Sequence, residues 1–403
     1  MSRVGSRRDA VDACPGALRP HVAADGGLIR LRLPGGVISA TALTGLAGLA
    51  ERFGDGALHL TSRGNLQLRG LRLVDGWVDP VLVQQVQRLG LLPAPAHELV
   101  RNVLASPSLP GSRIDLRPLV RALDTAICTD PALARLPGRF LFALDDGRAD
   151  VVGAGSDVGW WADSQATGTL VLAGLDTGLR INAGHSAWAL TVAAQAFLRL
   201  RDELGSTSWR LAELDGAADR ARDAVRASLP HRQVPVRRVP PAADRLERLG
   251  LLEGPGGRHS VAALVPLGRL SASAARTIAT SCSGEVLVTP WREVVLVDLS
   301  PAQARAALGT LAALPSSALE LSERSGWHGV SACAGRPGCA RALADVRAMA
   351  AAAAGARRPD DERVHFSGCE RRCGRPAGSH REIVMTMQGL FDGPASTQQN
   401  GSE

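Results

Sequence analysis

The chain has 403 residues, 45% of them hydrophobic, and a formal net charge of +7, so it is long enough for two domains or for one large pseudo-symmetric domain. All 46 basic residues are arginines, which excludes Schiff-base chemistry on lysine, and an aromatic content of 3% without tyrosine argues against nucleic-acid binding. Neither a run of about 18 apolar residues nor the apolar core of a secretory signal is visible, so we expect a cytoplasmic protein with reduced cysteines that binds no membrane.

Two short lobes with the same order of elements are predicted from the pattern of apolar residues. In the first, alternation indicates a strand at 27–33 and a strand–bend–strand unit at 57–71, with a helix at 40–52 between them. The same order returns late in the chain, at 260–267, 273–280 and 285–299. Both hairpins, HLTSRGNLQL and LVTPWREVVL, place a Thr and then an Arg between their arms. We interpret this as an internal repeat of two related halves, with chance similarity as the alternative.

Helices and a strand are predicted in the region between these lobes. Helices are expected at 81–92, 118–127, 186–204 and 217–229, and a strand at 139–144. The Pro- and Arg-rich stretch at 231–241 is interpreted as the linker between the halves. Gly153, Gly155 and Gly159 do not have the spacing of a dinucleotide-binding loop and are interpreted as a turn. The C-terminal residues, ending in PASTQQNGSE, are expected to be disordered.

Four of the seven cysteines form two close pairs near the C-terminus: Cys333 and Cys339, then Cys369 and Cys373. A helix predicted at 340–354 and a strand at 364–367 would return the second pair to the first, so that four thiolates converge. Such quartets bind zinc or iron–sulfur clusters, and the gaps of five and three residues favour an iron–sulfur cluster over zinc. Four incidental cysteines are the remaining alternative. Cys128 and Cys282 are interpreted as core thiols. No role is assigned to Cys14.

Several segments resemble the sulfite and nitrite reductases. The cysteine pattern is similar to that family's cluster motif, and HLTSRGNLQLRG matches its T-x-R-x-x-x-Q-x-x-G strand. RNVLASP and LPGRF are similar to its R-N-V and L-P-R-K-F segments. The resemblance implies that the four cysteines of the two pairs bind the cluster. It implies contacts to a tetrapyrrole or its anionic ligand from Thr61, Arg63, Gln67, Arg101, Asn102 and Arg139.

The same resemblance implies an α+β fold in which two ferredoxin-like half-lobes are related by a pseudo-twofold axis, each followed by a larger αβ lobe. We expect the half-lobes at 1–76, with an N-terminal extension, and at 231–303, with the linker. The αβ lobes are expected at 77–230 and at 304–403, the second carrying the cluster cysteines and the tail.

Within that family, the opening CPGALRPHVAADGGLIRLRLPGG and the segments VPLGRL and VLVTPWREVVL resemble the precorrin-3B synthases. That branch performs an oxygen-dependent hydroxylation of precorrin-3A, with lactone formation, in aerobic cobalamin biosynthesis. The reductases have two arginines and two lysines in their site. By position, Arg63 and Arg101 are kept, Arg139 replaces one lysine, and Leu141 replaces the other. Because no lysine can deliver protons, we expect precorrin-3A to bind as substrate where the reductases bind sirohaem, with arginines holding its carboxylates.

Two other functions remain open: a sirohaem-dependent sulfite or nitrite reductase, and a non-enzymatic zinc or cluster protein that carries or senses tetrapyrroles. The resemblance to the synthases also implies oxygen as co-substrate and a non-haem iron. No two-His-one-carboxylate spacing is visible, and His59, His365 and His380 are interpreted as structural. Because no nicotinamide or flavin motif is found, electrons are expected from a separate NAD(P)H-linked reductase or a ferredoxin.

Overall fold

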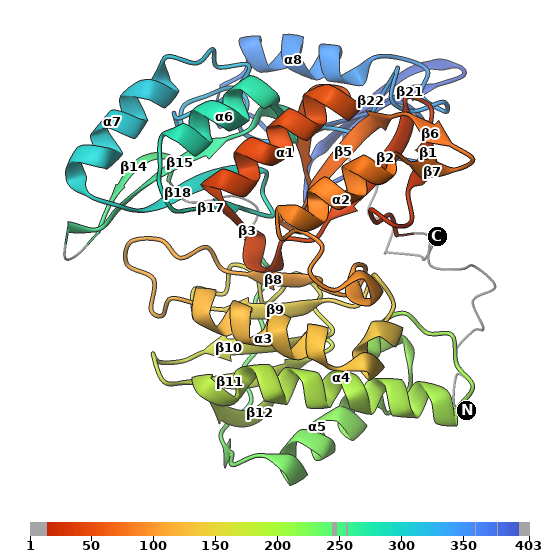
Figure 1. The fold of residues 1–403 in the computed structure, drawn as a ribbon, viewed down its shortest axis with the longest axis vertical. Helices are drawn as coiled ribbons and strands as arrows, with labels where there is room; N and C mark the ends of the chain where they lie inside the picture. Colours follow the sequence, from red (N-terminus) through yellow and green to blue (C-terminus); the bar gives the residue numbers. More distant parts are fainter. Residues whose placement is uncertain (1–13, 244–247, 255–256, 359, 377, 395–403) are drawn as a thin grey trace.

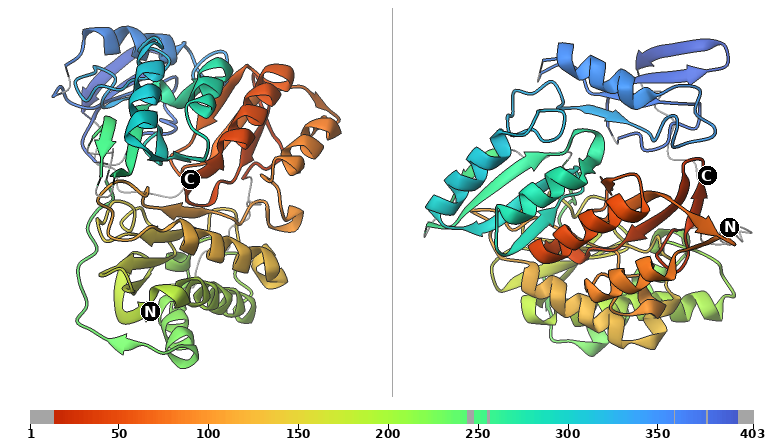
Figure 2. Two further views of the ribbon diagram at one scale, coloured as in Figure 1. Left: turned by 60° about the vertical axis from the view of Figure 1, so that its left-hand side comes forward. Right: turned by 45° about the horizontal axis from the view of Figure 1, so that its top comes forward.

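The structure is a computed structural model that describes residues 14–243, 248–254, 257–358, 360–376 and 378–394. Two sheets with the helices α1 and α6 form one end of the molecule, a larger sheet with α3, α4 and α5 forms the other, and α8 lies with a small sheet beside the first end (Figures 1 and 2). The helices are α1 (Ala40–Phe53), α2 (Pro80–Arg88), α3 (Arg117–Thr129), α4 (Ser186–Glu203), α5 (Ala217–Ser228), α6 (Ala272–Thr280), α7 (Pro301–Ala312) and α8 (Val346–Ala356).

The two five-stranded sheets exchange one strand each. Their orders are β1-β2-β5-β4-β16 and β14-β15-β18-β17-β3. The edge strand β16 (Arg269–Ser271) comes from the second half and pairs with β4, while β3 (Val37–Ser39) comes from the first half and pairs with β17. The two half-lobes are therefore interlocked. The other strands are β1 (His21–Ala23), β2 (Gly26–Leu31), β4 (Ala57–Leu60), β5 (Leu66–Leu71), β14 (Gly250–Glu253), β15 (His259–Leu264), β17 (Glu285–Val288) and β18 (Glu293–Leu299), and β6 (Leu73–Val74) and β7 (Trp77–Val78) form a separate pair.

Matching serines begin the two helices that cover these sheets. Ser39 accepts a hydrogen bond from the backbone N–H of Ala42 at the start of α1, and Ser271 accepts the same bond from Ala274 at the start of α6. Such N-caps satisfy backbone donors that a helix leaves open. The helices α1 and α6 pack side by side, and one hydrophobic core contains buried residues of both halves (Figure 2).

Equivalent hairpin turns show the same repeat. The N–H of Thr61 bonds to the carbonyl of Asn65, and the N–H of Thr289 bonds to the carbonyl of Glu293, four residues on in each case. In both turns the threonine hydroxyl accepts the N–H of that later residue. The predicted internal repeat is therefore confirmed, and with it the pseudo-twofold α+β architecture.

A six-stranded sheet forms the centre of the first αβ lobe. Its order is β13-β12-β11-β10-β9-β8, and α4 packs against β10 and contacts both α3 and α5 (Figure 1). Phe140 packs against the rings of both Phe142 and Phe197, each with ring centres 5.3 Å apart. The strands are β8 (Val103–Ala105), β9 (Phe142–Asp145), β10 (Val158–Ala162), β11 (Thr167–Leu172), β12 (Leu175–Asn182) and β13 (Arg232–Gln233).

The second αβ lobe has a four-stranded sheet in the order β19-β20-β21-β22. The helix α8 packs on β19 and β20, and Val346, Ala350 and Phe366 are buried between them. The first three strands are parallel, and β22 returns antiparallel to β21. The bounds are β19 (Val330–Ala332), β20 (Val364–Ser367), β21 (Arg381–Thr386) and β22 (Gly389–Pro394).

Most elements expected from the sequence are present, two expectations need correction, and three strands of one sheet were not predicted. The helix predicted at 340–354 is α8, which begins only at Val346 because the preceding residues fold against the cysteine loops. The strands β10 to β12 were not predicted, since β10 is buried on both faces and has no alternation of apolar and polar residues. The predicted linker packs against the first αβ lobe, because β13 pairs with β12 and Arg237 forms an ion pair with Asp176.

The division of the chain at residues 76, 230 and 303 stays a prediction, although the exchanged strands tie the two half-lobes together and residue 303 falls inside α7. The predicted disordered tail lies almost wholly outside the described residues. Over the described part of the chain, no helix is both long and apolar enough to span a membrane.

Candidate functional site

The parallel pairing of β19 and β20 brings the two cysteine loops together. Ala332, the last residue of β19, is in register with Phe366 of β20, so Cys333 and the Gly368–Cys369 step leave the same edge of the sheet. The N–H of Cys333 bonds to the carbonyl of Phe366 at 3.0 Å. The N–H of Gly368 in turn donates to the Cys333 sulfur at 3.2 Å. A backbone donor aimed at a thiolate stabilises its negative charge.

The segment after Cys339 wraps back over the second loop. The N–H of Leu343 bonds to the carbonyl of Gly368 at 2.8 Å, and the N–H of Ala342 bonds to the carbonyl of Cys339 at 3.1 Å. A Cβ atom on Gly368 would lie 2.7 Å from the Cβ of Ala342, so only glycine allows this approach. The Asp345 carboxylate then caps α8 by accepting N–H bonds from the first turn. This packing explains why the helix begins later than its alanine content predicts.

The four sulfurs share one electrostatic environment. Partial burial and the charges of Cys333 and Cys369 raise the pKa of the Cys373 thiol, Cys339 adds to this effect, and Arg371 opposes it. The neighbouring negative charges that raise the pKa of one thiol also favour binding of a shared cationic centre. The convergent sulfurs, the donor to Cys333 and the close glycine contact fit a 4Fe–4S cluster. The ligand assignment stays a prediction.

Buried polar groups support the second cysteine loop. His365 is fully buried, and burial followed by the charge of Arg292 lowers its pKa to about 4, so the ring is neutral at pH 7. Its Nε2 lies 3.2 Å from the carbonyl oxygen of Cys373, which can only accept, and Nδ1 lies 2.9 Å from the Ser331 hydroxyl. The proton is therefore on Nε2. On the other side, the buried Glu382 carboxylate lies 2.9 Å from Nε of Arg372.

Arg69 joins the cysteine loops to the first half-lobe. Its Nη2 donates to the carbonyl of Gly338 at 2.7 Å, and it also pairs with Asp25 through two hydrogen bonds. Gly338 lies between the first two cysteines of the quartet. Arg69 is on β5 two residues beyond Gln67, so both side chains leave the same face of that strand. The cysteine loop thus meets the strand that carries the predicted anion-binding motif.

A cluster of arginines lies at the ends of β2 and β4. Burial, with the charges of Arg30 and Arg63, lowers the pKa of Arg32 to about 10, while Cys14 hydrogen-bonds to it and acts in the opposite direction. Burial followed by the charge of Arg210 lowers the pKa of Arg63 to about 10. Several guanidinium groups gathered in a shielded place attract anions.

Arg32 belongs to this cluster but was not predicted from the sequence. Its side chain is 2% exposed, and its Nε and Nη1 have no hydrogen-bond partner among the described residues. Its Nη2 donates to the carbonyl of Gly138 at 3.3 Å. The available signal was an arginine inside the alternating stretch GLIRLRL, at a position adjoining buried leucines.

The predicted contact residues divide into two groups. Arg63 lies in the arginine cluster, and Gln67 accepts two hydrogen bonds from Arg30, so both belong to it. Thr61 instead closes the hairpin turn, with its hydroxyl accepting N–H bonds from Arg63 and Asn65.

The other three predicted residues have partners of their own. Arg101 is buried against Asp124 with two hydrogen bonds of 2.7 Å, which leaves its guanidinium engaged. Asn102 donates to the carbonyl of Phe140 at 3.1 Å. Arg139 is exposed and lies over the ring of Trp209, 4.9 Å from its centre. Arg139 directly follows Gly138, whose carbonyl accepts the bond from Arg32, so its backbone adjoins the cluster.

Comparison with known proteins agrees with this fold. Residues 21–75 match the family described as the nitrite/sulfite reductase ferredoxin-like half domain. The ferredoxin–nitrite reductase of Synechococcus elongatus is 27% identical over 391 residues, which cover 87% of this chain and 74% of that protein. The precorrin-3B synthase of a Sinorhizobium species is 26% identical over 404 residues, 96% of this chain and 86% of that protein. The structure of Mycobacterium tuberculosis NirA superimposes with a TM-score of 0.68 at 20% identity, covering 96% of this chain and 77% of that one.

Proposed function

We propose that this chain, a member of the sulfite and nitrite reductase family, is an oxidoreductase that hydroxylates precorrin-3A in the manner of the precorrin-3B synthases. The reaction forms a lactone and belongs to aerobic cobalamin biosynthesis. In support, the relative named precorrin-3B synthase matches more of this chain, and more of its own length, than the nitrite reductase named above.

The observation that carries the proposal is the environment of Leu141. It occupies the position at which the resemblance places a reductase lysine, and its side chain is 2% exposed and packs with Leu104 and Val151. It therefore supplies neither charge nor proton. The chain contains no lysine at any position, so no other residue supplies the missing ammonium group. Reduction of nitrite to ammonia consumes several protons, whereas a permanently charged guanidinium is a poor proton donor.

The arginine cluster supports a polycarboxylate substrate. Arg32 has two guanidinium nitrogens without a partner among the described residues, and Arg63 and Arg30 lie close enough to influence its pKa. Carboxylates bind such groups through paired, charge-assisted hydrogen bonds. We propose that these three arginines bind carboxylates at the rim of the macrocycle, and that Arg139 lies at the edge of the same surface.

The four cysteines would hold a 4Fe–4S cluster, which supplies one-electron transfer when bound. Other residues of the chain position the cysteines: Gly368 donates its N–H to the sulfur of Cys333, and the ring of His365 hydrogen-bonds to the carbonyl of Cys373. The names of the nitrite reductase relatives support a ferredoxin as the electron donor, with an NAD(P)H-linked reductase as the alternative. Oxygen is the proposed co-substrate, and no residue is assigned to a non-haem iron.

The test is turnover of precorrin-3A by anaerobically purified protein, with reduced ferredoxin added and then ¹⁸O₂. We expect a product that has gained one labelled oxygen atom, because one atom of O₂ enters the substrate and the other leaves as water with two electrons and two protons. Mass spectrometry of the product measures this. Iron and sulfide assays on the same preparation check the cluster.

The second candidate is a sirohaem-dependent nitrite reductase, which the similarity to several ferredoxin–nitrite reductases favours. In that case the arginine cluster would hold the carboxylates of sirohaem as a resident group. The visible absorption spectrum of the purified protein separates the two. Sirohaem bands together with nitrite-dependent oxidation of ferredoxin, and no labelled product, would overturn the synthase proposal.

A further inference from the structure

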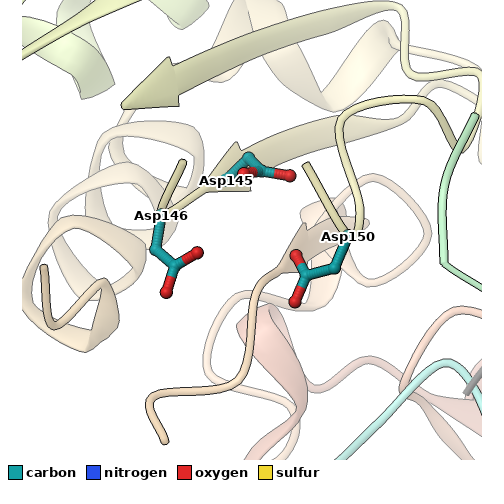
Figure 3. A group of neighbouring side chains, drawn as sticks. All are labelled: Asp145, Asp146 and Asp150. Atoms are coloured by element: carbon teal, nitrogen blue, oxygen red, sulfur yellow. The ribbon is translucent and has the colours of Figure 1, made fainter. Parts of the chain in front are cut away.

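Three aspartates lie together where β9 runs into the loop that leads to β10 (Figure 3). Asp145, Asp146 and Asp150 place carboxylate oxygens within 4.8 Å of one another. Asp145 is fully buried and Asp146 is 1% exposed, while the side chain of Asp150 is 12% exposed. Acidic groups on a surface are common, but three gathered below it are costly unless their charge is compensated. The proposed function uses none of them.

Positive charge near these aspartates is scarce. Arg148 pairs with Asp146 at 3.0 Å and with Asp150 at 3.3 Å, so one guanidinium serves two carboxylates. Arg113 lies beside Gly147, but its Nη1 donates to the carbonyl of Asp163.

Backbone groups satisfy the first aspartate and only part of the second, because Oδ1 of Asp146 accepts the N–H of Arg148 at 3.1 Å. The carboxylate of Asp145 accepts four backbone N–H bonds, from Gly147, Ala149, Val151 and Val152. Its hydrogen-bonding capacity is thus used by the turn. Asp146 and Asp150 retain negative charge that Arg148 compensates only in part.

One oxygen points to a missing partner. Oδ2 of Asp146 is buried and has no hydrogen-bond partner among the described residues. A buried carboxylate oxygen of this kind is rare in native proteins and indicates a bound ion or water. Figure 3 shows the carboxylates of Asp146 and Asp150 turned toward each other.

We propose that Asp146 and Asp150, with the hydroxyl of Ser106, bind a hard divalent cation such as Mg²⁺ or Ca²⁺. The Ser106 hydroxyl already donates to the Asp150 carboxylate and accepts the backbone N–H of Asp146, with 3.3 Å between N and O. The donors are all oxygens, which suits hard cations and does not suit a site for redox iron. Asp145 contributes its charge rather than a ligand, because its oxygens are taken by backbone donors.

The cation would fasten a junction between parts of the chain. Ser106 directly follows β8, whereas Asp146 and Asp150 follow β9. The carbonyl of Asp150 accepts the N–H of Ala243 at 2.9 Å, and the carbonyl of Ala243 accepts the indole N–H of Trp291 at 2.7 Å. Trp291 lies in the hairpin turn of the second half-lobe. The site thus lies where the first αβ lobe meets the second half-lobe.

Titration of the full-length protein with Mn²⁺, followed by electron paramagnetic resonance of the free ion, tests the proposal. We expect one site per chain that Mg²⁺ or Ca²⁺ displaces. Asp146→Asn keeps the shape of the side chain and should weaken binding at least tenfold, and Ser106→Ala should weaken it less. Asp75→Asn, on an exposed turn, is the matched control and should bind like the wild type.

Arg148→Met should change the affinity for Mn²⁺ in the opposite direction to Asp146→Asn. Removing the guanidinium should tighten Mn²⁺ binding several-fold, because the two carboxylates then lack their competing cation. Circular dichroism verifies folding of each variant. The proposal is overturned if the folded wild type binds no Mn²⁺, Mg²⁺ or Ca²⁺ at millimolar concentration, or if Asp146→Asn and Arg148→Met both bind as it does.

Discussion

Arg32 and Arg101 are both buried, and they differ in what faces them. Arg101 forms a bidentate pair with Asp124, so its charge is compensated within the fold. Arg32 has neighbouring arginines and two guanidinium nitrogens with no partner in the described part of the chain. An unsatisfied buried charge costs stability unless a ligand completes it, which is typical of binding sites. At the scale of residues, Arg32 is therefore available to bind a ligand, whereas Arg101 stabilises the fold.

Substitution of these two arginines should change the free energy of unfolding in opposite directions. Arg32→Met should raise the free energy of unfolding by roughly 1–3 kcal/mol, because it removes an unsatisfied buried charge, and should weaken binding of a polycarboxylate porphyrin roughly tenfold. Arg101→Met should lower the free energy of unfolding by about 3 kcal/mol, since Asp124 is left alone. Urea denaturation and fluorescence titration measure both quantities. Equal destabilisation by both changes would contradict the distinction.

At the scale of elements, the crossing of the two halves depends on glycine. Gly36 follows β2 and has a φ of +72°, and a Cβ atom there would lie 2.0 Å from the carbonyl oxygen of Val288 on β17. Its counterpart Gly268 has a φ of +67° and lies against Leu60 in the same way, with a Cβ–oxygen distance of 3.1 Å. The exchanged strands β3 and β16 begin directly after these glycines, so close approach of the backbones allows the exchange.

Substitutions in α1 and at the crossing should therefore act in opposite directions. Gly36→Ala should destabilise the protein by roughly 1–3 kcal/mol through strain and overlap with Val288. Gly48→Ala lies within α1 with no atom within 4 Å of the new Cβ, so it should stabilise by roughly 0.5–1 kcal/mol through helix propensity. Thermal unfolding followed by circular dichroism compares them. A neutral Gly36→Ala would show that the crossing tolerates a shift.

At the scale of the whole molecule, strand exchange makes the two half-lobes one cooperative unit. Each sheet has an edge strand from the other half, and one hydrophobic core contains residues of both. A half expressed alone would expose the unpaired edge of β4 or β17 and part of that core. Exposed edges and apolar faces promote aggregation rather than independent folding.

We therefore expect residues 1–243 and 248–403, produced separately, not to reach a native fold, and their co-expression to restore it. Near-ultraviolet circular dichroism and hydrogen exchange at Leu58 and Val286, which pair with the exchanged strands, provide the readout. If residues 1–243 alone protected Leu58 as the whole chain does, the strand exchange would not be needed for folding of the first sheet.

Local order in this protein is encoded by short stretches of sequence. Helix caps such as Ser39, the alternation in 27–33 and the spacing of the cysteine pairs act over a few residues, so the pattern alone predicts the helices, the hairpins and the repeat. The motif around Arg63 likewise identifies one member of the arginine cluster. The late start of α8 could not be read this way, because alanines favour a helix until the packing of Leu343 on Gly368 is known.

Contacts between distant residues were decided only by the tertiary structure. The cysteine spacing shows which two cysteines share each loop. The parallel alignment of β19 and β20 is what brings the two loops to the same end of the sheet. Whether an arginine is free or engaged depends on a partner such as Asp124, 23 positions away, and no local rule predicts it. The strand exchange and the aspartate cluster depend in the same way on long-range packing. Local propensity acts through neighbours in the chain, whereas charge compensation and strand pairing act through neighbours in space.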